Sequence, residues 1–361
     1  MKDLCPICNT QCKRINVNHP YFDHVNYQTI KTNGIILKCN LCHTVTNLKY
    51  NLKKANNFKT KKYAKSLQTK QTFISNGNKT LNTRSYFQAK IVVGMCNIPN
   101  KSRILDIGCF DGQFLKQIEN ILPKSELWGY DINNHLKSYI PKKKNYKFIC
   151  GNLNSINKTF DLISLSHSFF YFSRIKELIQ KINSSLNEKG ILFIQIPDIT
   201  KNPIYSLMGD QKFVFTSKSI INIFSQYGYD FKNIKHNAFP REVLLIGCRT
   251  LKKDKIKYNN DDSIFCAITA IDNMKMKLRS IDDKNLLVLG TTANAAYADE
   301  IIGDKIKYFV DENPNKYGKK FRGKYIIHPK WMKTNDKIII PYGETGYKIK
   351  NRLAKQFNAK Y

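Results

Sequence analysis

Between residues 72 and 251, short apolar runs alternate with segments whose apolar residues recur at helical spacing. The runs predict strands at 103–108, 126–132, 145–150, 160–166 and 191–196. Helical spacing predicts one helix at 113–122 and another over 173–187, which should stop at Gly190 as helix C-termini do. Strands that alternate with helices indicate a mostly parallel, doubly wound sheet of the α/β class.

The same pattern recurs on a smaller scale after the polar stretch at 252–262. A strand is expected at 285–290, a helix over 291–302, and further strands at 308–311 and 337–341. This second run of elements predicts a smaller α/β unit at the C-terminal end.

The N-terminal region is marked by two C-x2-C pairs separated by 30 residues. Each pair places two thiolates on one tight turn, and two such turns complete a tetrahedral S4 shell. The N-terminus reads MKDLCPICN, without the apolar segment of a secretory signal, so metal binding is favoured over disulfides. We expect Cys5, Cys8, Cys39 and Cys42 to hold a structural zinc ion, with Cys12 as a less favoured alternative ligand.

The charge balance is strongly basic. The 361 residues include 60 Lys plus Arg against 27 Asp plus Glu, a net charge of +33, and residues 24–105 contain no acid at all. Such a field attracts nucleic acids, nucleotide-sugars or acidic glycans, although a solvated basic surface is the plainer interpretation. The chain is 42% hydrophobic, too apolar for a disordered polyelectrolyte, and lacks a run of bilayer length. We expect a cytoplasmic protein with no membrane span.

The segment Ile104–Gly112, ILDIGCFDG, leads from a strand to a helix through two glycines. Glycine lets the backbone approach a ligand closely, and the helix N-terminus offers free N–H groups. Phe110 stands where a dinucleotide motif has its second glycine, and Asp106 and Asp111 add negative charge. These features favour a cationic ligand, the sulfonium and amino groups of S-adenosylmethionine, over a diphosphate.

Other cofactor contacts are expected at the ends of the next two strands. Asp131 is placed to accept hydrogen bonds from ribose hydroxyls, and the residues after the third strand lie beside the adenine. The cofactor-binding residues expected are Asp106, Gly108, Cys109, Phe110, Asp111, Gly112, Asp131, Ile132, Asn152 and Leu153.

On these motifs the chain resembles the S-adenosylmethionine-dependent sugar C-methyltransferase family. Its loop Asp106–Gly112 is similar to the family's E-I-G-S-N-D-G, and Tyr308–Gly318 resembles the family's V-D-x-N-P-x-K-x-G. The resemblance implies a zinc-binding domain at 1–71, a class I methyltransferase domain with a Rossmann-like sheet at 72–251, and a Rossmann-like substrate-binding domain at 252–361. It also implies that the substrate is a nucleotide-activated sugar or a glycan precursor.

One family motif is unmatched. Where the family has a catalytic Glu-His pair, this chain has Gly209–Thr216, GDQKFVFT, so the choice between carbon and oxygen as the methylated atom stays open. Methyl transfer to such an acceptor still needs a base. His167 at the end of the fourth strand is the first candidate, and Tyr171 and His236 are weaker ones. A histidine that simply bonds the backbone at a strand end is the alternative.

Two other functions are compatible with the sequence. The first is an RNA or DNA methyltransferase guided by the basic N-terminal end. Against it, the fourth strand leads into Ser166-His-Ser-Phe-Phe instead of the Asn/Asp-Pro-Pro-Tyr/Phe loop that holds a flipped base. The second is a non-catalytic module that binds S-adenosylmethionine, which the missing Glu-His pair motivates.

Overall fold

A computed structural model describes residues 3–51, 73–75, 81–250, 258–333 and 335–357. These residues divide into two units. The first comprises Met1–Ile15, Ile36–Asp198 and Gln211–Asp261, and the second comprises Asn16–Ile35, Ile199–Asp210 and Asp262–Tyr361. The boundaries predicted near 71 and 251, and part of the acid-free basic stretch, lie outside the described residues.

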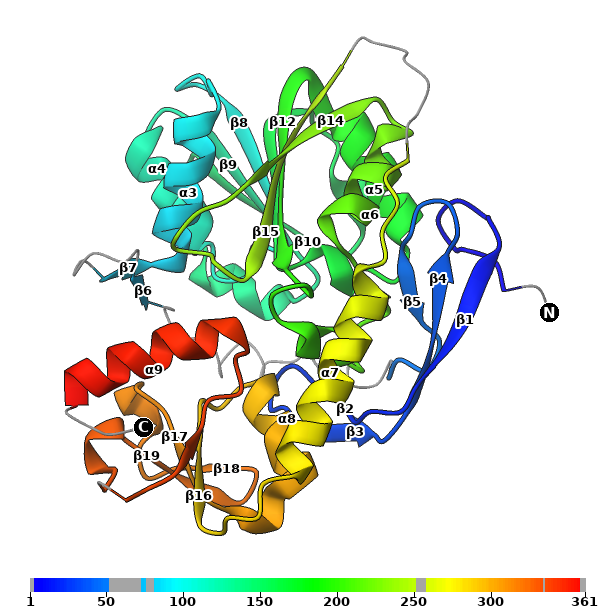
Figure 1. Ribbon diagram of the computed structural model, residues 1–361. Helices are drawn as coiled ribbons and strands as arrows, with labels where there is room; N and C mark the ends of the chain where they lie inside the picture. The colour runs from blue at the N-terminus through cyan, green and yellow to red at the C-terminus, as the bar shows by residue number, and fades with distance from the viewer. Residues whose placement is uncertain (1–2, 52–72, 76–80, 251–257, 334, 358–361) are drawn as a thin grey trace. The chain divides into compact units, whose positions relative to one another are not determined.

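The first unit is built on a seven-stranded sheet of order β10-β9-β8-β11-β12-β15-β14 (Figure 1). Five strands are parallel, and β15 and β14 extend the sheet in antiparallel fashion. The predicted α/β, Rossmann-like sheet is therefore confirmed. The strands are β8 (Arg103–Ile107), β9 (Glu126–Asp131), β10 (Tyr146–Cys150), β11 (Phe160–Ser166), β12 (Leu186–Pro197), β14 (Tyr229–Ile234) and β15 (Glu242–Arg249).

Helices cover both faces of this sheet (Figure 1). They are α3 (Arg84–Met95), α4 (Gln113–Ile121), α5 (Ile175–Ser185) and α6 (Ser217–Ser225). Alternate strand residues face opposite ways: Ile104 and Phe193 pack in the hydrophobic cluster with α3 and α4, whereas Leu105 and Ile194 pack in the cluster with α5 and α6. Both faces are apolar because a parallel sheet is buried on each side.

The start of β12 differs from the sequence-based expectation. The helix was expected to continue to 187 and to stop at Gly190, but α5 ends at Ser185 and β12 begins at Leu186. Leu186 is buried and pairs with Phe160 of β11, ahead of a register shift in the ladder. Pairing with a strand far away in the sequence thus overrides the local helical pattern.

The N-terminal part of the first unit contains a four-stranded sheet of order β1-β4-β5-β13. Its strands are β1 (Cys12–Val17), β4 (Gly34–Cys39), β5 (Val45–Asn47) and β13 (Phe213–Val214). The segment that aligns with the family's Glu-His motif therefore becomes an edge strand: Phe213 pairs with Thr46, and Val214 pairs with Val45.

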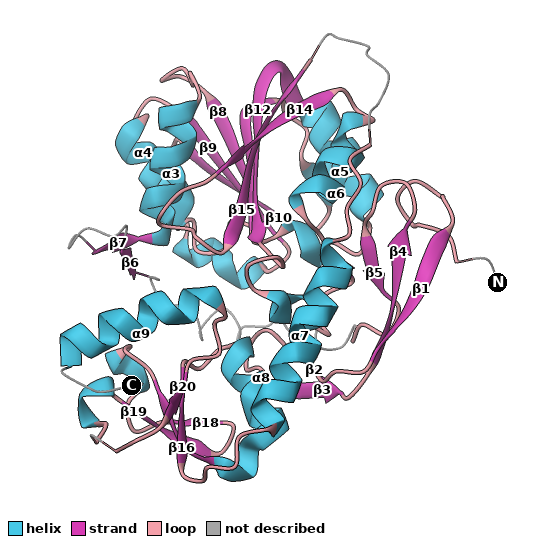
Figure 2. Ribbon diagram, viewed as in Figure 1, coloured by secondary structure: helices cyan, strands magenta, loops and turns pink. Residues whose placement is uncertain are grey.

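The second unit contains a five-stranded sheet of order β18-β19-β17-β16-β20 (Figure 2). Its elements are α7 (Ser263–Arg279), β16 (Leu286–Leu289), α8 (Ala293–Ile302), β17 (Ile306–Val310), β18 (Lys320–Phe321), β19 (Lys324–Ile327), β20 (Ile338–Ile339) and α9 (Glu344–Phe357). The predicted second α/β arrangement is present. Two short pairs complete the strands: β2 (Tyr21–Phe22) with β3 (Thr29–Lys31) in the second unit, and β6 (Phe73–Ser75) with β7 (Leu81–Thr83) in the first unit.

Short 3-10 helices lie in the loops of both units. They are η2 (Asn134–Tyr139), η3 (Leu153–Ser155), η4 (Phe169–Tyr171), η5 (Pro203–Leu207), η6 (Gly303–Lys305), η7 (Pro314–Lys316) and η8 (Pro329–Trp331). Among all the helices in the described ranges, none has the length and apolar character needed to cross a membrane.

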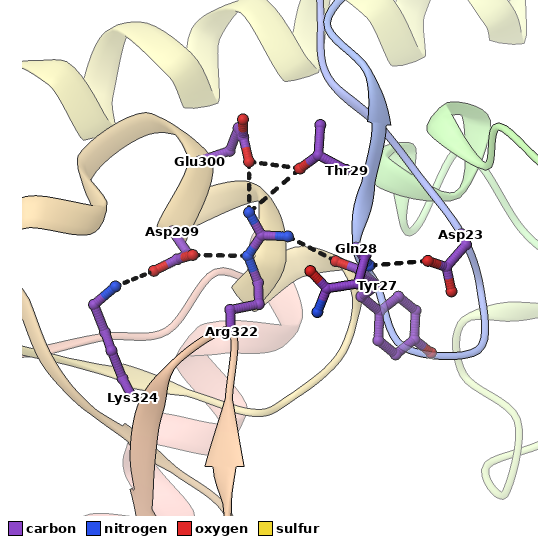
Figure 3. A network of polar contacts seen from close by, with 8 residues as sticks. All are labelled: Asp23, Tyr27, Gln28, Thr29, Asp299, Glu300, Arg322 and Lys324. Carbon is purple, nitrogen blue, oxygen red and sulfur yellow. Dashed lines mark hydrogen bonds and ion pairs between the residues drawn. The ribbon is translucent and has the colours of Figure 1, made fainter.

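A partly buried arginine fixes an N-terminal segment within the second unit (Figure 3). Arg322 donates through Nη1 to the Tyr27 carbonyl at 2.8 Å and through Nη2 to Glu300 at 2.5 Å. Its Nε donates to Asp299 at 2.7 Å, and Lys324 binds the other oxygen of that carboxylate at 2.7 Å. These contacts explain why residues 16–35 belong to the same unit as the C-terminal sheet.

Candidate functional site

The predicted cofactor loop lies between β8 and α4. Gly108 has φ +79°, and its N–H donates to the Tyr130 carbonyl at 2.7 Å, which links the loop to β9. A Cβ atom at Gly108 would lie 2.4 Å from Cβ of Ser168, the second residue after β11. Only glycine fits such a conformation at such a short distance. The loop backbone therefore closes directly onto the carboxyl ends of β9 and β11, where open α/β sheets bind ligands.

The Asp131 carboxylate ends β9 beside this loop. It accepts hydrogen bonds from the backbone N–H groups of Phe110 at 3.2 Å and Asn133 at 2.9 Å. Burial raises the pKa of Asp131, and these hydrogen bonds only partly oppose the shift. Within the described part of the chain it has no cationic partner. Asp131 therefore keeps acceptor capacity for hydroxyl groups of a ligand.

Two further carboxyl groups make the loop region strongly acidic. Asp106 is only 3% exposed and accepts a short hydrogen bond from the Ser164 hydroxyl, so it lies beneath the loop. Burial raises its pKa to about 7, Ser164 opposes the shift, and the nearby Asp131 and Asp111 reinforce it. Burial likewise raises the pKa of Asp111. This concentration of acids disfavours a pyrophosphate and fits a cationic ligand.

The other expected cofactor residues follow the same edge. Cys109 is buried, while Ile132 is exposed beyond β9. Asn152 caps η3 by accepting from the Asn154 N–H at 3.0 Å, with Leu153 half-buried beside it. The structure thus places the expected residues at the carboxyl ends of β8, β9 and β10.

His167, the first candidate base, lies at the carboxyl end of β11 next to Ser168. Its backbone has φ +56°, and its N–H donates to the Gln195 carbonyl at 2.9 Å. The imidazole Nε2 lies 2.9 Å from Glu242 Oε2 and 2.5 Å from Arg84 Nη2. Arg84 also forms a short ion pair with Glu242. The structure therefore places a glutamate beside His167, although segment 209–216 lacks the Glu-His pair of the family that the chain resembles.

Sequence reasoning missed Glu242 and Arg84. Glu242 is the first residue of β15 and pairs with Pro197, the last residue of β12. Because β15 runs antiparallel, its start lies at the same edge as the carboxyl ends of the parallel strands. Arg84 comes from the first turn of α3. No local signal in the sequence connects either residue to His167.

The charges in this cluster define its protonation at neutral pH. Burial lowers the pKa of His167, Arg84 lowers it further, and Glu242 opposes both. Burial by itself would raise the pKa of Glu242, but the positive charge of Arg84 and hydrogen bonds from His167 and Arg84 lower it. A neutral imidazole therefore lies beside an ionised carboxylate, which suits a general base.

The weaker candidates have other partners. The hydroxyl of Tyr171 accepts a hydrogen bond from Gln211 Nε2 at 3.3 Å, so the unmatched family segment does reach a candidate residue. His236 Nδ1 accepts from the Ala238 N–H at 3.1 Å, and its ring lies 6.2 Å from that of Phe239. These local contacts hold the turn before β15.

The four expected zinc ligands converge. The Sγ atoms of Cys5, Cys8, Cys39 and Cys42 all lie within 4.8 Å of one another. Cys12 lies close by, and its thiol points to the Thr10 carbonyl at 3.7 Å. A compact set of four thiols is the donor set that structural zinc prefers.

The two C-x2-C turns have equivalent geometry. Cys5 N–H donates to the Thr10 carbonyl at 2.9 Å, and Cys39 N–H donates to the Thr44 carbonyl at 3.0 Å. In each turn a backbone N–H two residues on approaches the first sulfur at 3.4 Å. Donors directed at sulfur stabilise thiolates, which are the form in which cysteine binds a metal ion.

Part of this chain is similar in sequence to known methyltransferases. Residues 82–234 match the family model described as a methyltransferase domain. Malonyl-[acyl-carrier protein] O-methyltransferase of Calditerrivibrio nitroreducens is 32% identical over 91 residues, which cover 25% of this chain and 36% of that protein. The enzyme of the same name from Bacillus anthracis is 26% identical over 95 residues, 25% of this chain and 35% of that protein. The chain thus spans about a third of the length of these curated relatives.

Among solved structures, the glycopeptide N-methyltransferase MtfA is similar with a TM-score of 0.38 and 9% identity, covering 46% of this chain and 90% of that one. The family match includes the β8 loop, Asp131 and His167. Residues 82–234 are therefore similar to a methyltransferase domain over the part of the chain that holds the cofactor loop and the first candidate base.

Proposed function

We propose that this protein transfers a methyl group from S-adenosylmethionine to a nucleotide-activated sugar or a related glycan precursor. One observation carries the methyl-transfer part of the proposal. The cofactor loop at Gly108 closes onto Ser168, and the adjacent residue His167 is a neutral imidazole held by Glu242. A base and the expected cofactor loop thus adjoin at one edge of the sheet.

When bound, S-adenosylmethionine supplies an electrophilic methyl group. Asp131 accepts hydrogen bonds from ribose hydroxyls, and the acidic loop favours the cationic part of the cofactor. Nε2 of His167 is engaged by Arg84 and Glu242. Its Nδ1, for which the described residues provide no hydrogen-bond partner, is the nitrogen left to take the acceptor's proton. Alignment of acceptor and methyl group contributes most of the rate.

The sugar part of the proposal rests on the sequence resemblance. Sugar C-methyltransferases have a zinc-binding region, a methyltransferase region and a Rossmann-like region in this order along the chain. They also have a motif similar to Tyr308–Gly318. The net charge of +33 also suits a diphosphate-bearing substrate. The curated relatives align over a quarter of this chain, so their acyl-carrier substrate does not direct the choice of acceptor here.

We also propose that the four-cysteine cluster holds a structural zinc ion. Cys5, Cys39 and Cys42 belong to the same hydrophobic cluster as Phe213 and Phe215, and Cys8 packs against it. A closed shell of four thiolates leaves no position for substrate, so the ion stabilises the N-terminal sheet.

Incubation with labelled S-adenosylmethionine and a panel of keto- and deoxy-sugar nucleotides tests the proposal, with mass spectrometry to locate the added methyl group. Label on the sugar, lost in His167→Gln, is the expected result. Malonyl-acyl carrier protein and RNA serve as comparison substrates.

Label on the carrier protein or RNA alone would overturn the sugar assignment. Tight binding of S-adenosylmethionine with no transfer to any acceptor in the panel would favour the non-catalytic module.

A further inference from the structure

The imidazole of His167 faces two partners with opposite hydrogen-bonding character. Arg84 Nη2, which can only donate, lies 2.5 Å from Nε2, and Glu242 Oε2, which can only accept when ionised, lies 2.9 Å from the same nitrogen. One ring nitrogen cannot satisfy both at once. Each partner therefore stabilises a different tautomer: Arg84 binds a bare Nε2, and Glu242 binds an Nε2 that carries hydrogen.

Oε2 of Glu242 likewise lies close to more than one hydrogen-bond donor. Oε2 accepts from Gln195 Nε2 at 2.5 Å, in addition to the contacts with Arg84 and His167. Gln195 is in turn fixed by Gln88, whose Nε2 donates to its Oε1 at 2.6 Å. Gln88 and Gln195 are both buried, so the carboxylate is anchored by neutral groups, independently of the imidazole.

We propose that Glu242 and Arg84 are both positioning residues for the base His167, and that each favours a different tautomer of its imidazole. Glu242 holds the tautomer with hydrogen on Nε2, which leaves Nδ1 bare and able to take a proton. Arg84 holds the reverse tautomer and disfavours the charged imidazolium. This proposal rests on the function proposed above and adds the two residues that set the state of its base.

The proposed step is balanced without any further reactant. As the acceptor atom bonds to the methyl carbon and the carbon–sulfur bond breaks, its electron pair stays on sulfur. The proton of the acceptor moves to Nδ1 of His167. The imidazolium that forms then donates from Nε2 to the Glu242 carboxylate, which stabilises its charge, and the proton later passes to solvent.

The surroundings limit which groups can act on the imidazole. Arg84 comes from α3, Glu242 from β15, and Gln195 from β12. From η4, the Phe170 ring meets the imidazole edge-on at 6.3 Å. Among the described residues, Arg84 and Glu242 are the charged groups that shift the pKa of His167, and they do so in opposite directions.

A nitrogen-resolved NMR titration of the imidazoles tests the proposal in the full-length protein. The His167 signals are assigned by their absence in His167→Gln. The chemical shifts of Nδ1 and Nε2 report the tautomer, and their pH dependence reports the pKa. The variants are Glu242→Gln and Arg84→Gln, each compared with its charge-conserving control, Glu242→Asp or Arg84→Lys.

In Glu242→Gln the pKa of His167 should fall by about one unit, because the carboxylate that favours the imidazolium is gone. Arg84, without its ion-pair partner, should then shift the neutral form towards the tautomer with bare Nε2. In Arg84→Gln the pKa should rise by about one unit, and the tautomer should shift towards hydrogen on Nε2. The charge-conserving variants should stay closer to the native values.

Shifts of the same sign in both folded variants, or none, would overturn the proposal. If a glutamine variant fails to give a native-like amide spectrum, its charge-conserving partner still reports, because a displaced charge should produce a smaller shift of the same sign. The titration needs no acceptor. Opposite shifts without methyl transfer to any sugar nucleotide would therefore refute the proposed substrate and leave the tautomer assignment standing.

Discussion

The two units contain the same strand–turn–helix–strand arrangement, with matching backbone hydrogen bonds. Gly108 N–H donates to the Tyr130 carbonyl at 2.7 Å, and Gly290 N–H donates to the Val310 carbonyl at 2.7 Å. An aspartate lies at the end of each second strand, as the last residue of β9 or the first residue after β17. It accepts from the N–H two residues on, at 2.9 Å for Asp131 and 3.0 Å for Asp311.

The side chains around the two turns differ. Asp311 is bound by Lys316 Nζ at 2.8 Å and by the Thr291 hydroxyl at 2.6 Å, whereas the described contacts of Asp131 come from backbone N–H groups. A Cβ atom at Gly290 would lie 1.9 Å from the Tyr342 hydroxyl, so the second turn is filled by its own unit. The fold produces the turn, and the neutralisation of its carboxylate decides whether the turn can receive a cationic ligand.

The largest effect on stability should come from removing a cysteine ligand. Only the first unit should be destabilised, because only that unit contains the proposed zinc ligands. Cys39→Ser should lose the zinc and destabilise the N-terminal sheet, because structural zinc contributes on the order of 10 kcal/mol. Metal analysis by mass spectrometry and hydrogen exchange should show loss of protection in β4 and β5, while β16 and β17 stay protected. Cys12→Ser is the matched control and should keep one ion per chain. Equal loss of metal in both variants would place Cys12 in the shell.

A pH effect should be confined to the first unit, because Asp106 occupies the place in β8 that Val288 occupies in β16. The folded pKa of Asp106, about 7, exceeds its ordinary value of 3.8, so the folded state retains a proton that the unfolded state releases. Its contribution to stability is therefore largest below the unfolded pKa and falls as pH rises through the folded value. The fall is at most about 1.4 kcal/mol per pH unit.

Hydrogen exchange of β8 peptides at pH 5 and pH 7 measures this effect. Asp106→Asn should flatten the pH dependence in β8 and leave β16 unchanged. An unaltered slope in the variant would mean that the carboxyl group is ionised throughout.

The next effect concerns ligand binding. Asp131→Asn should weaken binding of S-adenosylmethionine about 10- to 100-fold, because charge-assisted hydrogen bonds contribute about 1.5–3 kcal/mol. Asp311→Asn is the matched control in the second turn and should bind the cofactor normally. Calorimetry on both variants measures the difference. The comparison between the turns fails if the two substitutions weaken binding equally.

The smallest effect should come from the second turn itself. Gly290→Ala forces a side chain into a φ of +90° and against Tyr342, and should cost the second unit about 1–3 kcal/mol. Adding Tyr342→Phe should recover the part due to contact with the hydroxyl. Thermal unfolding measures both changes, and cofactor affinity should stay constant. A fall in affinity in Gly290→Ala would assign cofactor contacts to the second turn.

The sequence by itself determined the features that depend on neighbouring residues. The apolar runs and the glycine at Gly108 predicted the β8 turn and its acidic strand ends, because helix and strand periods are local. The paired C-x2-C turns predicted a four-thiol cluster, and the structure brings the four sulfurs together. Asp131 was predicted at a strand end, and it lies there.

Only the tertiary structure decided which distant residues surround those features. The partners of His167 come from α3 and β15, 83 and 75 residues away along the chain. Because β15 runs antiparallel, it begins at the edge of the sheet where the parallel strands end. Arg322 fixes residues 27–29 by contacts that span nearly 300 positions. Leu186 joins a strand by pairing with Phe160. Such choices arise from packing and charge pairing between separate segments, for which the local pattern of residues carries no signal.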